Sequence, residues 1–197
     1  MPVIAPYDPS QVDSIVLLLG DAFVTNPLHI AAFGNERLDL NRLFFGIALE
    51  HMFKSSAFVA TLDGKPCGYM HFGTWPFCLP PADQVQAAGE SILKPLGTAV
   101  PRVVEWLSTW CRFDPKEPHV HLGPIGVSPD VQGHGIGTAL MNRYVEHLDQ
   151  NSVAGYLETD RPENVGFYEK FGFVVQRKQE LIGTPLWYMW RPSKAAA

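Results

Sequence analysis

The sequence predicts an α/β fold of the α+β type, in which helices flank a mixed and mostly antiparallel central sheet. Apolar residues recur at helical spacing in some segments and alternate in others, so the expected elements run β-α-α-β-β, a long segment, then β-α-β-α-β-β. Two hairpin-like pairs of runs favour antiparallel strands, whereas one strand–helix–strand unit favours a central parallel pair. A chain of 197 residues fits one domain, or one domain with an elaborate insertion.

The first 72 residues are expected to form a strand, two helices and a hairpin. The run VIAPY is typical of a short strand, and Asp8-Pro9 marks the start of a helix that continues through GDAF. The apolar residues of this helix share one face: Val12, Ile15, Val16, Leu19 and Phe23. A second helix is expected from Leu38 to about Met52. The run SAFVATLDGKPCGYMHF predicts a hairpin that turns at Asp63-Gly64.

Residues 73–118 interrupt this pattern. The segment contains many of the chain's prolines together with Trp75, Trp106 and Trp110, and one helix is expected in it, near Pro101 to Cys111. So long a segment between strands is uncommon unless it is functional. We therefore interpret residues 73–118 as an insertion within a single domain that spans residues 1–197.

The last third of the chain returns to regular elements. HVHLGPIGV predicts a strand, VAGYLETD a second strand, and RPENVGFYEKFG a helix with Pro162 in its first turn and Gly172 as its stop. FVVQRKQELIGTPLWYMWR predicts a closing hairpin that turns at Gly183-Thr184-Pro185. The helix GIGTALMNRYVEHLDQ, between the two strands, has one apolar face: Ile136, Leu140, Tyr144 and Leu148.

Composition argues against several classes of partner. A net charge of −5 without a basic run argues against nucleic acid, and no apolar run is long enough to cross a bilayer. The N-terminal residues do not resemble a secretory signal, so we expect a cytoplasmic protein without a membrane partner. Three cysteines without paired spacing fit reduced thiols in a reducing compartment and predict no bound metal.

The stretch SPDVQGHGIGTAL, residues 128–140, contains three glycines at alternate positions between a strand and a helix. It lacks the lysine of a P-loop and the glycine spacing of a dinucleotide fingerprint. Gln132, Gly135 and Gly137 instead fit the pattern Q/R-x-x-G-x-G/A. Backbone N–H groups at a helix N-terminus are unpaired, and glycines allow a pyrophosphate to approach them. A glycine-rich loop that only turns the chain is the alternative.

Pro124 provides an independent signal inside HLGPIGV. Because proline lacks an N–H group, it is excluded from central strands except at bulges, and the adjacent Gly123 favours a bulge. A bulge near Pro124 would splay this strand from AGYLET and leave the backbone groups of Ile125, Gly126 and Val127 unpaired on that side. The amides of an extended ligand would be able to pair with them. An edge strand is the alternative.

These motifs together resemble a known family. GVSPDVQGHGIGTALM resembles the acyl-CoA-binding motif of the GNAT superfamily of N-acetyltransferases, and ENVGFYEKFGFVV resembles the motif that follows it. The resemblance is specific from Pro118 to about Gln176 and generic before residue 73. It implies a GNAT-like sheet, acetyl-CoA as cosubstrate, and a cofactor arm that enters the splay. The cofactor-binding residues that it implies are Ile125, Gly126, Val127, Gln132, Gly133, His134, Gly135, Ile136, Gly137, Thr138, Asn164 and Tyr168.

Acetyl transfer to an amine requires a base, an oxyanion donor and an acid for the thiolate. Tyr168 occupies the family's position for the acid, and a phenol is protonated at neutral pH. The N–H group of Val127 is the expected oxyanion donor. Glu158 beside the splay is a candidate base, and so are His119 and His121, which share one strand face. Relay of the proton through water is a further alternative. Packing or cleft-lining roles are the alternatives for each side chain.

The sequence therefore predicts N-acetylation of a primary amine on a small molecule by direct attack in a ternary complex. Neither motif contains a cysteine, so a covalent acetyl-cysteine route has no support. Trp75, Trp106, Trp110 and Phe77 of residues 73–118 are candidates for the wall of the acceptor site, and covering the hydrophobic core is the alternative. A monomer or homodimer is expected. A non-catalytic acyl-CoA sensor and an acetyltransferase of peptide or protein amines are the alternatives.

Overall fold

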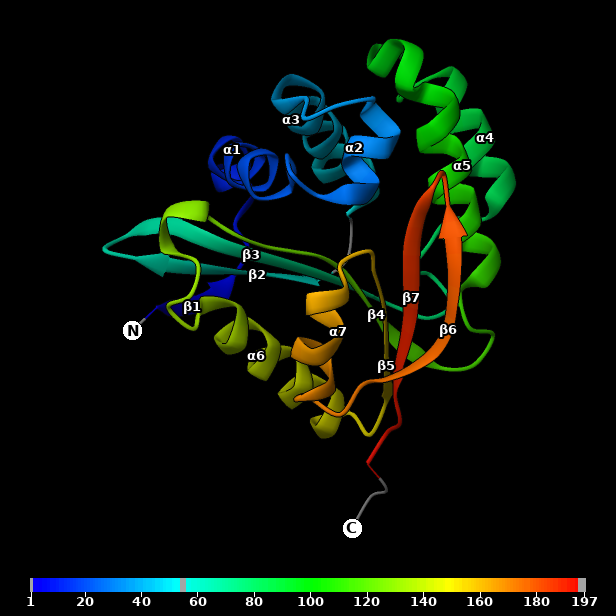
Figure 1. The fold of residues 1–197 in the computed structure, drawn as a ribbon. Coiled ribbons are helices and arrows are strands. Elements are labelled where there is room, and N and C mark those ends of the chain that lie inside the picture. Colours follow the sequence, from blue (N-terminus) through cyan, green and yellow to red (C-terminus); the bar gives the residue numbers. More distant parts are fainter. Residues whose placement is uncertain (1, 54–55, 195–197) are drawn as a thin grey trace.

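The computed structural model describes residues 2–53 and 56–194 (Figure 1). Within these residues, seven strands form one sheet in the order β1-β2-β3-β4-β5-β7-β6. Neighbouring strands are antiparallel except β4 and β5, which are parallel, so the predicted mixed sheet is confirmed. The strands are β1 (Val3–Pro6), β2 (Ser56–Leu62), β3 (Lys65–Thr74), β4 (His119–Val127), β5 (Ala154–Thr159), β6 (Val174–Leu181) and β7 (Thr184–Arg191).

Helices cover both faces of this sheet (Figure 1). Gly126 of β4 packs under Leu19 and Phe23 of the first helix, whereas Gly68 of β3 packs under Ile136 of the sixth. A Cβ atom at either glycine would lie about 2.9 Å from a helix side chain, so these close approaches require glycine. The helices are α1 (Val12–Phe23), α2 (Pro27–Phe33), α3 (Leu38–Ile47), α4 (Ala82–Glu90), α5 (Val100–Phe113), α6 (Ile136–Gln150) and α7 (Pro162–Glu169).

Two hydrophobic cores follow from this arrangement. One joins α1, α2, α3 and α5 to the sheet, and the other joins α6 and α7 to the opposite face. The predicted face of α6 is confirmed, since all four of its apolar residues are at most 1% exposed. On the predicted face of α1, Ile15 and Leu19 are fully buried, and Val12, Val16 and Phe23 are partly buried.

Local signals account for several element boundaries. Asp8 accepts a hydrogen bond from the Ser10 N–H at 2.8 Å, which caps the short 3-10 turn Pro9–Gln11 that leads into α1. The predicted hairpin turn at Asp63-Gly64 is confirmed, and both residues have positive φ, +50° and +76°. The second predicted helix forms as α3 followed by a π-helical turn, Ala48–Met52.

The strand β4 contains the predicted bulge. In its pairing with β3, His71 alone lies opposite Gly123 and Pro124. The parallel pairing with β5 ends at His121 and Tyr156, although both strands continue beyond these residues. The two central strands therefore diverge beside the bulge, as the proline predicts.

The structure corrects three local expectations. The closing hairpin turns at Ile182-Gly183, not at Gly183-Thr184-Pro185, and Thr184 and Pro185 already belong to β7. The helices α2 and α4 have no counterpart in the predicted element order. For α2 the signals were present, because Asn26 caps it by accepting from the His29 N–H at 3.1 Å and Gly34 ends it at φ +89°.

No single helix in the described part of the chain has the length and apolar character to span a bilayer. One bent pair, Pro9–Phe23 with Pro27–Phe33, meets these criteria only when its two helices are taken together, across a 98° bend.

Candidate active site

A cavity opens where β4 and β5 diverge. It encloses about 1120 Å³ when counted out to the solvent at its mouth, which is ample for a small ligand. The bulge at Pro124 and Ile125 lines one part of it, together with Asn164 and Tyr168 of α7. Glu158 at the end of β5 lies in the same lining. The structure therefore brings the bulged strand and the Asn164–Tyr168 motif into one cavity, whereas residues 126–138 of the glycine-loop motif lie outside its lining.

The glycine loop begins directly after β4. Gly133 and Gly135 have φ of +80° and +78°, a region that favours glycine, so both glycines are required by the backbone. The Gln132 side chain donates from Nε2 to the Val127 carbonyl at 3.0 Å and anchors the loop to the strand. His134 is exposed, and its Nδ1 lies 3.0 Å from the Gln132 carbonyl.

The loop also positions the free end of α6. The N–H of Ala139 donates to the Gly135 carbonyl at 2.9 Å and is the first to bond within the helix. The N–H groups of Ile136, Gly137 and Thr138 precede it and project from the helix end. A Cβ atom at Gly137 would lie 3.8 Å from Phe167, so this end is next to α7. The arrangement is suited to binding a phosphate.

Tyr168 lies on α7 and is 6% exposed. Burial raises the pKa of its phenol above 10, and the nearby charge of Asp160 raises it further. Tyr168 is thus protonated at neutral pH and able to donate its proton inside the cavity. Asn164, four residues before it, is half-buried and lies in the same lining.

The two candidate bases contact each other. His121 Nε2 lies 2.7 Å from Glu158 Oε2, and His121 Nδ1 lies 3.1 Å from Asp114 Oδ1. Burial alone would lower the pKa of His121, but the charge of Glu158 and the hydrogen bond to Asp114 outweigh it and raise that pKa well above 6.5. Glu158 Oε1 is buried and has no hydrogen-bond partner within the described residues.

Aromatic side chains form the other part of the cavity wall. Trp106 and Trp110 of α5 are in the lining, with ring centroids 5.2 Å apart at 88°, whereas Phe77 is 86% exposed and lies outside it. The expectation for Phe77 is therefore wrong, and Trp75 is likewise absent from the lining as described. The other aromatic lining residues come from α1 to α3 and the chain after them: Phe23, Phe44, Phe45 and Phe53.

Two buried histidines in this wall were not predicted. His29 of α2 stacks against Phe45, and its Nδ1 lies 2.7 Å from Asn41 Oδ1. Burial lowers the pKa of His29 to about 3, and burial lowers the pKa of His71 to about 4. Neither ring nitrogen of His71 has a partner within the residues that the structure describes.

Asp160, directly after β5, connects the cavity to α2. Its two carboxylate oxygens accept from Asn26 Nδ2 at 2.9 Å and from the Leu28 N–H at 2.7 Å. Burial raises the pKa of Asp160, although these hydrogen bonds oppose the rise. Asp160 therefore fixes the start of α2 against the sheet. Sequence reasoning missed it because its partners lie more than 130 positions away.

Comparison with known proteins agrees with this geometry. A model of the acetyltransferase (GNAT) family matches residues 26–173, more than half of the chain. The chain therefore belongs to the GNAT family of acetyltransferases. The family and the enzyme class predicted from the sequence, an acyltransferase, are confirmed.

The individual proteins that match this chain are similar to it either over a short segment or at low sequence identity. A mycothiol acetyltransferase of Paenarthrobacter aurescens (strain TC1) is 38% identical over 72 residues, which span 33% of this chain and 22% of that protein. A solved Corynebacterium glutamicum structure, described as a histone acetyltransferase and related acetyltransferase, has a TM-score of 0.70 at 21% identity and covers 100% of this chain and 98% of its own. The yncA protein of Salmonella typhimurium, solved with its cofactor acetyl-CoA, has a TM-score of 0.58 at 16% identity, with 100% and 97% coverage.

Proposed function

We propose that this protein transfers an acetyl group from acetyl-CoA to a primary amine of a small molecule, by direct attack in a ternary complex. One observation carries the proposal. A single cavity is lined by the bulged strand and Tyr168 in one part and by buried aromatic side chains in the other. A thioester and an amine that occupy these two parts would meet beside Glu158 and Tyr168.

The cofactor end uses main-chain groups. The projecting N–H groups of Ile136, Gly137 and Thr138 bind the pyrophosphate, and the left-handed glycines give it access to the loop. The pantetheine arm then pairs with residues 125–127 of β4, on the side that β5 leaves open. The yncA structure, solved with acetyl-CoA on the same fold, supports this cosubstrate.

The acid and the oxyanion donor lie at the end of this path. Tyr168 donates its phenolic proton to the departing thiolate, and its burial keeps that proton in place until the thiolate forms. The N–H group of Val127 stabilises the oxyanion of the tetrahedral intermediate. The acetyl carbon forms its bond to the amine nitrogen as the carbon–sulfur bond breaks.

Glu158 is the base that we propose. Glu158 lines the cavity, and its Oε1 is buried without a partner in the described chain, which fits a group that takes the ammonium proton directly or through a water. His121 has both ring nitrogens within hydrogen-bond distance of carboxylates. We therefore assign His121 to the positioning of Glu158.

The walls of the acceptor end favour a partly apolar amine. Trp106, Trp110 and Phe44 supply flat apolar surface, and His71 offers two unpartnered ring nitrogens within the described residues. The carboxylate of Asp160 is already occupied by hydrogen bonds from α2, which leaves Glu158 as the anion for an ammonium group. Polyamines would lack partners for their additional charges.

The experiment is a thiol-release screen. Acetyl-, propionyl- and succinyl-CoA are each combined with aromatic and aliphatic amines, polyamines, aminoglycosides, amino acids and peptides with free N-termini, and products are identified by mass spectrometry. We expect acetyl transfer to a small, partly apolar amine. Faster acetylation of polyamines or aminoglycosides would contradict the acceptor class.

Two other functions are distinguished by the same assay. Acetylation of peptides above all small amines would establish a peptide or protein acetyltransferase. A thermal shift with coenzyme A but no thiol release with any acceptor would establish an acyl-CoA sensor. The buried phenol of Tyr168 favours turnover over the sensor role, because sensing alone needs no acid there.

A further inference from the structure

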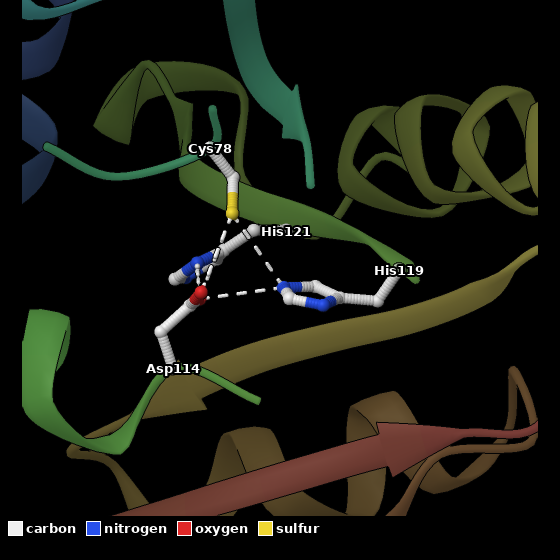
Figure 2. Close-up of side chains that lie close together, drawn as sticks. All are labelled: Cys78, Asp114, His119 and His121. Carbon is white, nitrogen blue, oxygen red and sulfur yellow. Dashed lines mark hydrogen bonds and ion pairs between the residues drawn. The ribbon is translucent and has the colours of Figure 1, made fainter. Parts of the chain in front are cut away.

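Four side chains of metal-binding type converge beside β4 (Figure 2). Cys78 follows β3, Asp114 directly follows α5, and His119 and His121 project from the same face of β4. One ligand atom from each of the four lies within 4.8 Å of the others. We propose that these four residues, the Cys78 cluster, bind one Zn²⁺ ion. This site goes beyond acetyl transfer and does not depend on it.

The spacing of the four ligand atoms fits a tetrahedral zinc ion. Bonds of about 2.0 to 2.3 Å at tetrahedral angles separate neighbouring ligand atoms by about 3.3 to 3.7 Å. Cys78 Sγ lies 3.6 Å from His119 Nε2 and 3.5 Å from Asp114 Oδ2. Asp114 Oδ1 lies 3.3 Å from His119 Nε2 and 3.1 Å from His121 Nδ1. A zinc ion between them would need little movement of any side chain.

The outward nitrogen of each histidine has a partner. His119 Nδ1 lies 2.8 Å from the Glu117 carbonyl, so it carries the proton and directs the lone pair of Nε2 at the cluster. His121 Nε2 lies 2.7 Å from Glu158 Oε2 and similarly leaves Nδ1 for the metal. Metal-bound histidines almost always show such carbonyl or carboxylate partners, which fix the ring and its tautomer.

Charge and burial fit the same ion. One thiolate, one carboxylate and two neutral imidazoles balance the charge of Zn²⁺, and binding would release the thiol proton of Cys78. His119, His121 and Asp114 are at most 8% exposed. Four protein ligands in a closed tetrahedral set are typical of a structural zinc site, and thiolate, imidazole and carboxylate groups all bind zinc, although structural sites usually use only the first two.

The backbone positions Cys78 for this role. Cys78 packs against Gly73, and a Cβ atom at Gly73 would lie 2.8 Å from the Cys78 Cα. Gly73 is itself paired with His121 across β3 and β4, and the Trp75 N–H donates to the His119 carbonyl at 3.0 Å. The chain after β3 is thus held over the two histidines.

A bound zinc would connect residues 73–118 to the sheet at both ends of that segment. Cys78 lies near its start and Asp114 near its end, and both would share one ion with β4. Cys78, His121 and Glu158 also line the cavity, so the ion would rigidify the wall between its two parts. The Cys78 cluster would then order the acceptor site without contacting the acetyl group.

The test measures metal directly. Wild-type protein is purified in reducing buffer, dialysed against zinc and then against zinc-free buffer, and its metal content is determined by plasma mass spectrometry. We expect about one zinc per chain, and much less in Cys78→Ser and His119→Gln. Cys111→Ser is the matched control, because this half-buried cysteine is outside the cluster and its variant should retain the ion.

Two further measurements use the intact wild-type chain. Cobalt substitution should give the intense visible absorption of a tetrahedral cobalt thiolate, which Cys78→Ser should lack. Chelation should lower the Tm of the wild type and of Cys111→Ser by about 5 °C or more, and leave Cys78→Ser nearly unchanged.

Two results would overturn the proposal. One is a wild-type zinc content no higher than that of Cys78→Ser. The other is zinc-free wild-type protein in which acetyl-CoA transfers one acetyl group to Cys78, since the cysteine would then be a nucleophile paired with His119. Zinc content is measured without acyl-CoA, so the first result leaves the test of amine acetylation independent. Acetylation of Cys78 would also bear on the proposed direct attack, and amine acetylation by Cys78→Ser would distinguish the two proposals.

Discussion

The two parts of the cavity are built from different chemical groups. The cofactor end consists of the splayed strand at Pro124 and Ile125 and, beyond the cavity lining, of the exposed glycine loop of residues 132–138 with its backbone N–H groups. The acceptor end consists mainly of side chains from α1, α2, α3 and α5, among them the buried His29 and Trp106, together with Asp160 after β5. The first end depends on local backbone geometry, and the second depends on contacts between distant segments.

This difference implies different tolerance to change. A backbone site keeps its ligand through substitutions that preserve the loop, and it discriminates little beyond the phosphate and amide groups of the cofactor. A side-chain site changes its ligand preference with each wall residue. We therefore expect substitutions at the two ends to affect separate kinetic constants, and substitutions where the ends meet to affect turnover.

The largest effect is expected at Tyr168, where the two ends meet. Tyr168→Phe removes the proton donor for the thiolate and keeps the ring, so kcat should fall about 10²- to 10⁴-fold with little change in the acetyl-CoA KM. Steady-state kinetics with both substrates varied would measure it. Tyr7→Phe, outside the cavity lining, is the control. Unchanged turnover across the pH range would remove Tyr168 from the mechanism.

A smaller effect is expected at the cofactor end. Gly135→Asp places a Cβ atom at φ +78° and a carboxylate against the pyrophosphate, so the acetyl-CoA KM should rise about 10- to 100-fold. Gly135→Ala carries the backbone strain without the charge and should show a smaller rise. If the cofactor KM is the same in Gly135→Asp and the wild type, the loop does not bind the pyrophosphate.

At the acceptor end, Trp110→Leu should raise the acceptor KM about tenfold, because it removes aromatic surface from the wall. The acetyl-CoA KM should stay within about twofold of the wild type. Trp187→Leu, on β7 and outside the lining, serves as the comparison. A change in the cofactor KM alone would show that the two ends are not separate.

The smallest effect concerns stability at the acceptor end. Burial lowers the pKa of His29 to about 3, whereas the unfolded chain has the ordinary value of 6.5. Between these pH values the unfolded chain binds a proton that the folded chain excludes. The free energy of unfolding therefore falls as pH falls, by about 1.4 kcal/mol per pH unit. The loss of stability that is due to His29 begins near pH 6.5 and ends near pH 3.

His29→Gln removes this titration. From pH 7 to pH 5, its free energy of unfolding should fall by about 2 kcal/mol less than that of the wild type, as measured by urea denaturation. Other groups titrate equally in both proteins, so the difference isolates His29. Identical slopes would mean that His29 is protonated inside the folded protein.

The cofactor end was predictable because its signals are local. Gln132, Gly135 and Gly137 specify a turn and a helix end within six residues, and Pro124 specifies the bulge by the N–H that it lacks. Gly133 had no explanation in the motif, and its φ of +80° now provides one. The hairpin at Asp63-Gly64 and the face of α6 follow equally local rules.

The acceptor end was not predictable in the same way. His119 and His121 show by alternation that they share a strand face. Cys78 and Asp114, which lie near these histidines in the fold, are 36 positions apart in the sequence and belong to no common motif. Asp160 stabilises α2 only through the fold. Trp106 lies on the buried face of the predicted helix, whereas Phe77 lies in a proline-rich stretch without periodicity, so the sequence did not indicate that Phe77 is exposed.

The most direct test of the two-part cavity is a crystal structure with coenzyme A and an acceptor amine. The account predicts that the pyrophosphate lies on the N–H groups of residues 136–138 and that the thiol lies within hydrogen-bond distance of the Tyr168 hydroxyl. The amine should lie between Glu158 and the Trp106 wall. Coenzyme A bound elsewhere, or a thiol directed away from Tyr168, would contradict it.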